Sequence, residues 1–137
     1  MTPQESEVWQ VITAFNAAFA ANDVETYFTY MDDDLVVIVP HSPYRIEGIT
    51  PDREGFEYSL KVGSGRVGYF QALQPLIRVY GDTAIVTYYS RGSYGAEGQT
   101  KTAYYKETDV LVRRADGWKI AHIHVSATGQ LPFKALF

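Results

Sequence analysis

Cysteine is absent from this chain of 137 residues, so it has no disulfide framework and no thiolate chemistry. No apolar run is long enough to span a bilayer, and no segment reads as the apolar part of a signal peptide. These absences predict a protein without a membrane partner, and we expect a cytoplasmic location.

Positive charge is also scarce, because 12 lysines and arginines stand against 16 aspartates and glutamates, for a formal net charge of −4. An acidic chain is repelled by phosphate backbones, so nucleic acid is disfavoured as a partner. What the chain has in abundance is aromatic: 11 tyrosines and seven phenylalanines, residues that line amphipathic pockets and also fill ordinary cores. The length and the 46% hydrophobic content predict one domain over residues 1–137.

Three helices are predicted in the first half of the chain. The first begins with a capping box, because Thr2 is followed by Pro3 and, three residues after the cap, by Glu5. Asn22 is a plausible left-handed stop, and Asp23 can cap a second, short helix. A strand over residues 35–39 and a third helix over residues 50–61 follow.

From residue 67 onward the apolar period changes to two, which predicts strands. We expect them over residues 68–73 with 76–80, 83–93, 100–113 and 118–127, with turns at Gly81-Asp82 and Ala115-Asp116-Gly117. The tail after about residue 129 is expected to be peripheral. Three helices followed by a meander indicate an α+β protein with helices on one face of an antiparallel sheet.

Three segments together resemble a known family. They are Asn22–Met31 (NDVETYFTYM), Ala72–Arg91 (ALQPLIRVYGDTAIVTYYSR) and Glu107–Ser126 (ETDVLVRRADGWKIAHIHVS). In order and spacing they resemble the association (hub) domain of calcium/calmodulin-dependent protein kinase II, and more broadly SnoaL-like and ketosteroid-isomerase-like proteins of the nuclear transport factor 2-like superfamily. The resemblance implies a cone-shaped, cystatin-like fold: about three N-terminal helices packed on a strongly curved antiparallel or mixed sheet.

Departures from the relatives bear on function. Where ketosteroid isomerases carry a catalytic tyrosine and aspartate, local alignment places Phe15 and Val39, and neither can move a proton. Steroid isomerisation by that mechanism is therefore disfavoured. Of the arginines that converge in the hub domain, Arg91 matches one, whereas Asp109 and Val125 stand in place of two others.

Asp109 and Arg91 are the candidate catalytic residues. Strand alternation predicts that Tyr89 shares the face of Arg91, and that Glu107 shares the face of Asp109. If both faces line the cone, Asp109 and Arg91 form a proton-transfer pair or an anchor for a ligand. The alternative is an ion pair that only fixes two strands.

Further ligand-binding candidates surround this pair. Tyr27 and Tyr89 could donate phenolic hydrogen bonds, and His41 and Tyr44 follow the first strand at the expected rim of the cone. Ile123 and Val125 are expected to face inward from the last strand. 

Two histidines, His122 and His124, share one face of that last strand. Parity puts this face outside the cone, so we expect surface or interface histidines, with no metal and no cofactor.

Two functions remain open. The first is a small-molecule-binding protein whose ligand carries a carboxylate or carbonyl group. If that protein is an enzyme, we expect a cofactor-free isomerase, cyclase or dehydratase that uses acid–base chemistry. The second is a non-catalytic oligomerisation or ligand-binding module. A homodimer, or a higher oligomer, would form through the outer sheet face, which is expected to carry Val110, Val112, Ile120, His122 and His124.

Overall fold

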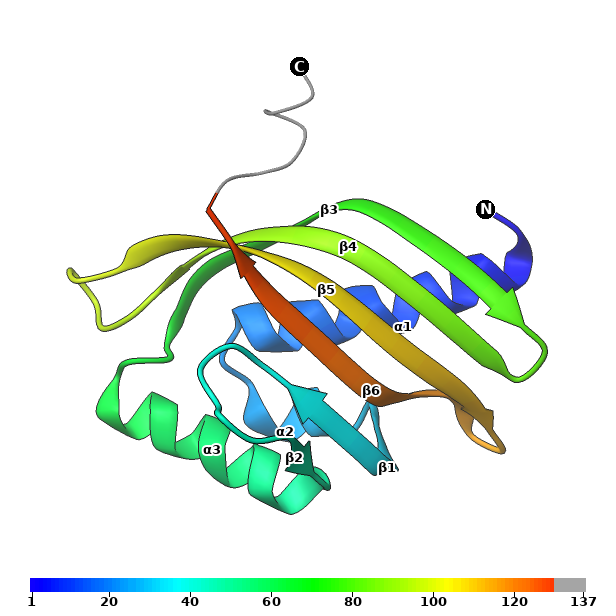
Figure 1. The fold of residues 1–137 in the computed structure, drawn as a ribbon, viewed down its shortest axis with the longest axis horizontal. Helices are drawn as coiled ribbons and strands as arrows, with labels where there is room; N and C mark the ends of the chain where they lie inside the picture. Colours follow the sequence, from blue (N-terminus) through cyan, green and yellow to red (C-terminus); the bar gives the residue numbers. More distant parts are fainter. Residues whose placement is uncertain (130–137) are drawn as a thin grey trace.

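A six-stranded sheet curves around one long helix in the computed structural model, which describes residues 1–129 (Figure 1). The helices are α1 (Pro3–Ala20), α2 (Val24–Phe28) and α3 (Ile49–Val62). The strands are β1 (Met31–Ile38), β2 (Ile46–Glu47), β3 (Val67–Tyr80), β4 (Thr83–Tyr94), β5 (Lys101–Arg114) and β6 (Gly117–Thr128). The expected tail after residue 129 lies outside the described residues.

The sheet is mixed, with the strand order β2-β1-β6-β5-β4-β3. β1 runs parallel to β6, and every other neighbouring pair is antiparallel. Helix α1 lies along the concave face, and α2 and α3 close the side near β1 and β2 (Figure 1). The α+β class and the curved mixed sheet predicted from the sequence are confirmed.

Local side-chain chemistry sets the helix ends as predicted. The Glu5 amide donates to Thr2 Oγ1 at 3.1 Å and the Thr2 amide donates to Glu5 Oε1 at 2.8 Å, which completes the capping box. Asn22 has a φ of +56°, the left-handed conformation that ends α1. Asp23 caps α2 by accepting a hydrogen bond from the Thr26 amide at 3.1 Å.

Strand β1 begins earlier than predicted, at Met31 rather than at residue 35. The reason is an ion pair: Asp32, 6% exposed, accepts hydrogen bonds from Arg114 at 2.8 and 3.0 Å. A run of three aspartates is depleted in strands, so sequence pattern alone favours a loop there. The partner that offsets the burial of Asp32 comes from the far end of β5.

An extra residue in β6 changes which side chains face the core. Leu111 pairs with Ile120 but Val110 pairs with His122, so Ala121 is a β-bulge. Ile120 and Ile123 therefore both point inward, at 0% and 3% exposure. The expectation that Ile120 lies on the outer face is wrong, because strict alternation fails at this bulge, whereas His122 does lie on the outer face.

The core forms between α1 and the concave face of the sheet. Val8 and Ile12 of α1 are fully buried against the inward residues of β4, of which Ala84 and Val86 are fully buried and Tyr88 is 2% exposed. Alternation along β4 fixes its even-numbered residues as the inner face. No helix within residues 1–129 has the length and apolarity needed to cross a bilayer.

Candidate functional site

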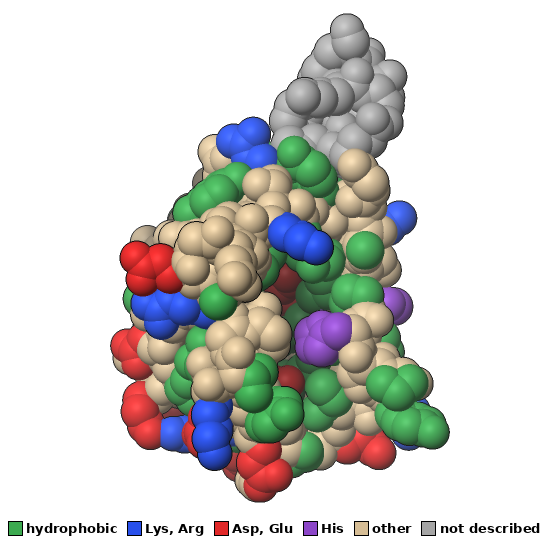
Figure 2. Space-filling model, turned by 90° about the vertical axis from the view of Figure 1, so that its left-hand side faces the viewer, with side chains coloured by type: hydrophobic (Ala, Val, Ile, Leu, Met, Phe, Trp, Pro, Cys, Tyr) green, Lys and Arg blue, Asp and Glu red, His purple; other side chains and the backbone are tan. Residues whose placement is uncertain are grey.

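The open end of the cone holds a cavity of about 680 Å³, between α1, α3, the loop after β1 and the inner face of the sheet. Figure 2 shows a hollow on this side of the molecule, with acidic side chains visible in its depth and a histidine at its edge. A volume of this size suits a small organic ligand. The cavity is therefore the candidate functional site.

Five aromatic rings, which we call the aromatic wall, form much of the lining. The rings of Tyr27 and Phe56 lie 5.0 Å apart, those of Phe19 and Phe70 lie 5.4 Å apart, and Tyr94 joins them through Phe19 at 6.2 Å. These separations are in the range of edge-to-face and offset aromatic contacts. The wall offers an apolar surface with polarisable faces to whatever occupies the cavity.

Two carboxyl groups and one hydroxyl meet at the inner end of the cavity. Glu107 and Asp109 are two residues apart on β5, so both point inward, and their β4 partners are Tyr88 and Val86. The Tyr88 hydroxyl donates to Glu107 Oε2 at 2.7 Å and also lies 3.3 Å from Asp109 Oδ2. Glu107 lines the cavity, whereas Asp109 is fully buried behind it.

Burial dominates the protonation of this carboxyl pair. It raises the pKa of Asp109 well above its usual value, and the charge of Glu107 and a hydrogen bond to that group raise it further. Burial also raises the pKa of Glu107, while hydrogen bonds from Asp109 and Tyr88 act in the opposite direction. Burial therefore favours the protonated form of both carboxyl groups, and it favours that of Asp109 more strongly.

Asn16 and Tyr27 complete the polar part of the lining. Asn16, 8% exposed, lies 3.2 Å from the Tyr88 hydroxyl through its amide oxygen, and its Nδ2 has no partner within residues 1–129. Burial, followed by the charges of Asp52, Glu107 and Asp109, raises the pKa of Tyr27 well above its usual value. Its phenol thus stays protonated as a hydrogen-bond donor.

Asp52 is a site residue that the sequence reasoning missed. It lies in the first turn of α3 and lines the cavity, and burial raises its pKa to about 6. It stands four residues before Phe56, so the two share one face of the helix. That spacing, an acid on the same stripe as an aromatic residue, is the sequence signal that could have found it.

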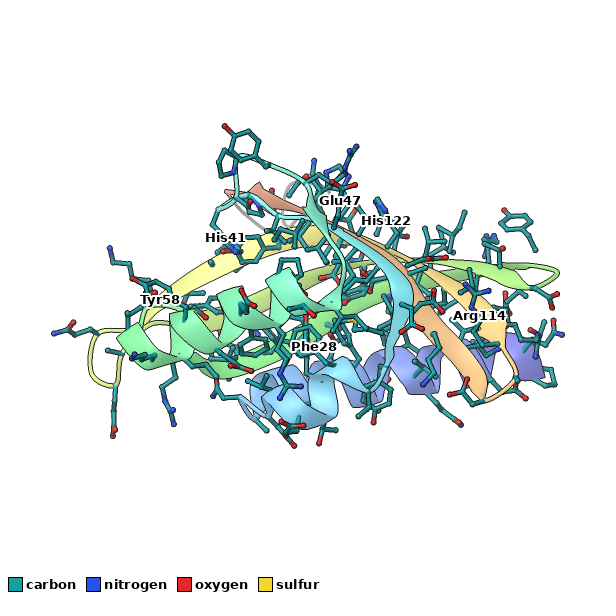
Figure 3. The ribbon with its side chains drawn as sticks, turned by 90° about the horizontal axis from the view of Figure 1, so that it is seen from below. Phe28, His41, Glu47, Tyr58, Arg114 and His122 are labelled. Atoms are coloured by element: carbon teal, nitrogen blue, oxygen red, sulfur yellow. The ribbon has the colours of Figure 1, made fainter. Side chains whose placement is uncertain are left out.

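Five residues predicted from the sequence do line the cavity: Tyr27, His41, Glu107, Ile123 and Val125. His41 belongs to the loop after β1 and stands beside α3, which carries Tyr58 at the same cavity (Figure 3). Asp109 sits directly behind Glu107. The structure therefore brings together most of the predicted ligand-binding set around the predicted acid.

The predicted partner of Asp109 lies elsewhere. Arg91 is on the outer face of β4, where its Nη2 donates to Gln71 Oε1 at 2.8 Å. Its β5 neighbour is Tyr104, whereas Asp109 pairs with Val86. The expected pairing of Arg91 with Asp109 inside the cone is wrong, because odd-numbered residues of β4 and odd-numbered residues of β5 point to opposite faces.

Two other placements differ from expectation. Tyr89 follows Arg91 to the outer face, where it lines a second hollow of about 420 Å³ with Thr87 and His124. Tyr44 is 81% exposed and is not part of the cavity lining. Within residues 1–129 no group of three or more His, Asp or Glu side chains is arranged to hold a metal ion.

The chain is similar to a known family over most of its length. The sequence model of the SnoaL-like domain matches residues 8–130, which is most of the chain. The chain belongs to this family, and its fold is that of the nuclear transport factor 2-like superfamily. The comparison with curated proteins found no match.

Solved structures agree with the family. The CaMKII hub of S. rosetta is 26% identical, with a TM-score of 0.77 over 93% of this chain and 98% of that one. An NTF2-like protein of unknown function from Pseudomonas putida is 21% identical, with a TM-score of 0.82 over 97% and 92%. A ketosteroid isomerase-like protein from Erwinia carotovora atroseptica is 20% identical, with a TM-score of 0.79 over 95% and 100%. 

Proposed function

We propose that this protein binds a small, largely apolar molecule in the cavity and catalyses a cofactor-free proton transfer on it. The observation that carries the proposal is the position of Glu107: it faces the cavity while its carboxyl accepts a hydrogen bond from Tyr88, whose hydroxyl also lies 3.3 Å from the buried Asp109. A carboxyl whose pKa is raised towards neutrality is suited to act as a general base or acid.

Each group in the cavity has a distinct role in this proposal. The Glu107 carboxylate removes a proton from a carbon next to a ligand carbonyl, and the electron pair of that bond moves onto the carbonyl oxygen. The Tyr27 phenol donates a hydrogen bond to this developing oxyanion, which lowers the barrier. Asp109 does not touch the ligand; it positions Glu107 and sets its basicity. Returning the proton to another atom of the ligand completes an isomerisation.

The proposal is tested by hydrogen exchange at activated carbons. The purified protein is incubated in D₂O with 2-tetralone or cyclohexanone, and loss of the α-proton signals is followed by NMR. We expect the wild type to accelerate exchange above buffer, and Glu107→Gln to reduce the acceleration by about 10²-fold or more. Lys106→Gln, next in sequence but exposed on the other face, is the matched control. Exchange at the buffer rate with wild-type protein would reject proton transfer.

Self-association is the second candidate function. Its support is the outer sheet face, where Leu76 and Ile85 are 50% and 38% exposed, and the likeness to the S. rosetta CaMKII hub. Where exposed apolar side chains form a contiguous patch, that patch often marks a contact surface. Light scattering should then show a dimer or larger assembly that Ile85→Asp dissociates. A protein that stays monomeric at high micromolar concentration would reject this candidate. Self-association and catalysis are compatible with each other.

A further inference from the structure

The charges around the cavity are unbalanced. Asp52 and Glu107 both line it, and within residues 1–129 neither a lysine nor an arginine does; the remaining ionisable nitrogen is that of His41 at the rim. Desolvated negative charge without a counter-ion costs free energy. A cavity lined in this way repels a carboxylate ligand and stabilises a cation.

Asp52 in particular has no partner among the residues that the structure describes. No hydrogen bond or ion pair joins it to another residue among positions 1–129, and the adjacent Arg53 is committed to Glu25 and Glu57 on the outside of α3. Asp32, by contrast, is buried but paired with Arg114, whose side chain is 47% exposed. Asp32 and Asp109 have polar partners in Arg114 and Tyr88, whereas Asp52, partly exposed at the cavity, has none among the described residues.

The aromatic wall supplies the second half of a cation site. Asp52 and Phe56 lie on the same face of α3, and Phe56 contacts Tyr27, which lines the same cavity as Asp52. Aromatic faces attract ammonium groups, and the attraction grows when the site is desolvated. The side-chain amide nitrogen Nδ2 of Asn16 lies in the same lining and has no partner among the described residues. It can donate a hydrogen bond to an acceptor on the ligand.

We propose that the cavity binds a hydrophobic amine in its ammonium form, with Asp52 as the counter-ion and the rings of Tyr27 and Phe56 around the cation. This inference rests on the proposed function in taking the cavity as a ligand site, and it names the ligand class. Asp52 lines the cavity from helix α3, and Glu107 lines it from strand β5 of the sheet. An ammonium group held at Asp52 therefore directs the rest of the ligand towards Glu107 and Asp109.

A matched ligand series tests the inference. Binding of 4-phenylbutylamine, 4-phenylbutan-1-ol and 4-phenylbutyric acid is measured by titration calorimetry at pH 7.5, where Asp52 is ionised. We expect the amine to bind best and the acid worst. Asp52→Asn, which keeps the shape and removes the charge, should weaken the amine about tenfold and leave the alcohol unchanged. Glu54→Gln, an exposed acid on the same helix, removes the same charge as a control and should leave all three unchanged.

The outcomes separate this inference from the proposed function. If the alcohol or the acid binds as tightly as the amine, or if Asp52→Asn leaves the amine unaffected, the amine class is overturned while the cavity remains a ligand site. If none of the three binds, the amine class is overturned as well. The proposed proton transfer fails on its own measurement, the exchange of ketone α-protons and its dependence on Glu107.

Discussion

The two faces of strands β4 and β5 differ in nearly every physical property, although their residues alternate one by one along the same backbone. Inward, Tyr88 and Asp109 are 2% and 0% exposed and belong to one hydrogen-bonded cluster with Glu107. Outward, Tyr89 and Lys106 border an open hollow. The neighbouring residues Lys106 and Glu107 therefore lie in different environments, one in solvent and one in the cavity lining. The candidate chemistry belongs to the inner face alone.

The largest contrast between the faces is expected at the β6 bulge. Ile120→Ala should lower the free energy of unfolding by about 2–5 kcal/mol, because it empties part of a fully buried site. His122→Ala, two residues on but on the outer face, should change it by about 0.5 kcal/mol or less. Urea unfolding followed by circular dichroism measures both. Equal losses of unfolding free energy in the two variants would contradict the assignment of a β-bulge at Ala121.

Two neighbouring tyrosines offer a smaller but more specific comparison. Tyr88→Phe removes the hydroxyl that donates to Glu107 and should cost about 1–3 kcal/mol, since hydrogen bonds to charged groups are the stronger ones. Tyr89→Phe makes the same chemical change on the outer face and should be nearly neutral. The same denaturation experiment applies, and a neutral Tyr88→Phe would mean that the carboxyl pair does not depend on this donor.

Asp52 should cost stability in a way that depends on pH. Its pKa is about 6 in the folded protein against an ordinary value of 3.8, so the folded state binds this proton more tightly than the unfolded state does. The associated stability is present below pH 3.8 and is lost as the pH rises through 6. Asp52→Asn should therefore be more stable than wild type by about 1–2 kcal/mol at pH 7.5, allowing for partial exposure.

At pH 4 the same substitution should have little effect, and thermal unfolding at the two pH values compares them. Glu54→Gln, on the exposed side of α3, should not show this pH-dependent gain. A stabilisation by Asp52→Asn that is equal at both pH values would show that removal of the charge is not its cause.

The smallest effect is expected at Arg91, whose guanidinium contacts Gln71 on the exposed face. Arg91→Ala should change the free energy of unfolding by about 0.5 kcal/mol or less, since exposed polar contacts contribute little. It should leave calorimetric binding of any cavity ligand unchanged. A loss of ligand binding in this variant would place Arg91 back at the site and break the separation of the two faces.

Local chemistry made much of this fold predictable. The capping box at Thr2 and Glu5, the left-handed Asn22 and the cap at Asp23 each depend on neighbours within a few residues, so pattern alone indicates them. The same holds for the shared face of Glu107 and Asp109, which alternation within one strand fixes.

Relations between elements were harder to predict. The phase of Arg91 relative to Asp109 depends on the β4–β5 register, and the inward turn of Ile120 depends on a bulge that no residue type in β6 announces. The spacing of Asp52 and Phe56 indicates that they share a face of α3, but whether that face turns towards the cavity depends on how α3 packs against the cone. Each of these depends on a contact between residues distant in sequence, which a single sequence does not display.

Because the Tyr88 hydroxyl has a single hydrogen, ligand binding at this site is coupled to the release of protons. That hydroxyl touches oxygens of three side chains, so the Glu107–Asp109 pair must retain a hydrogen of its own for the cluster to hold together. A positively charged ligand lowers the affinity of the pair for that hydrogen. Ligand binding would then release protons to the buffer. The measured heat of binding would therefore vary with the ionisation enthalpy of the buffer.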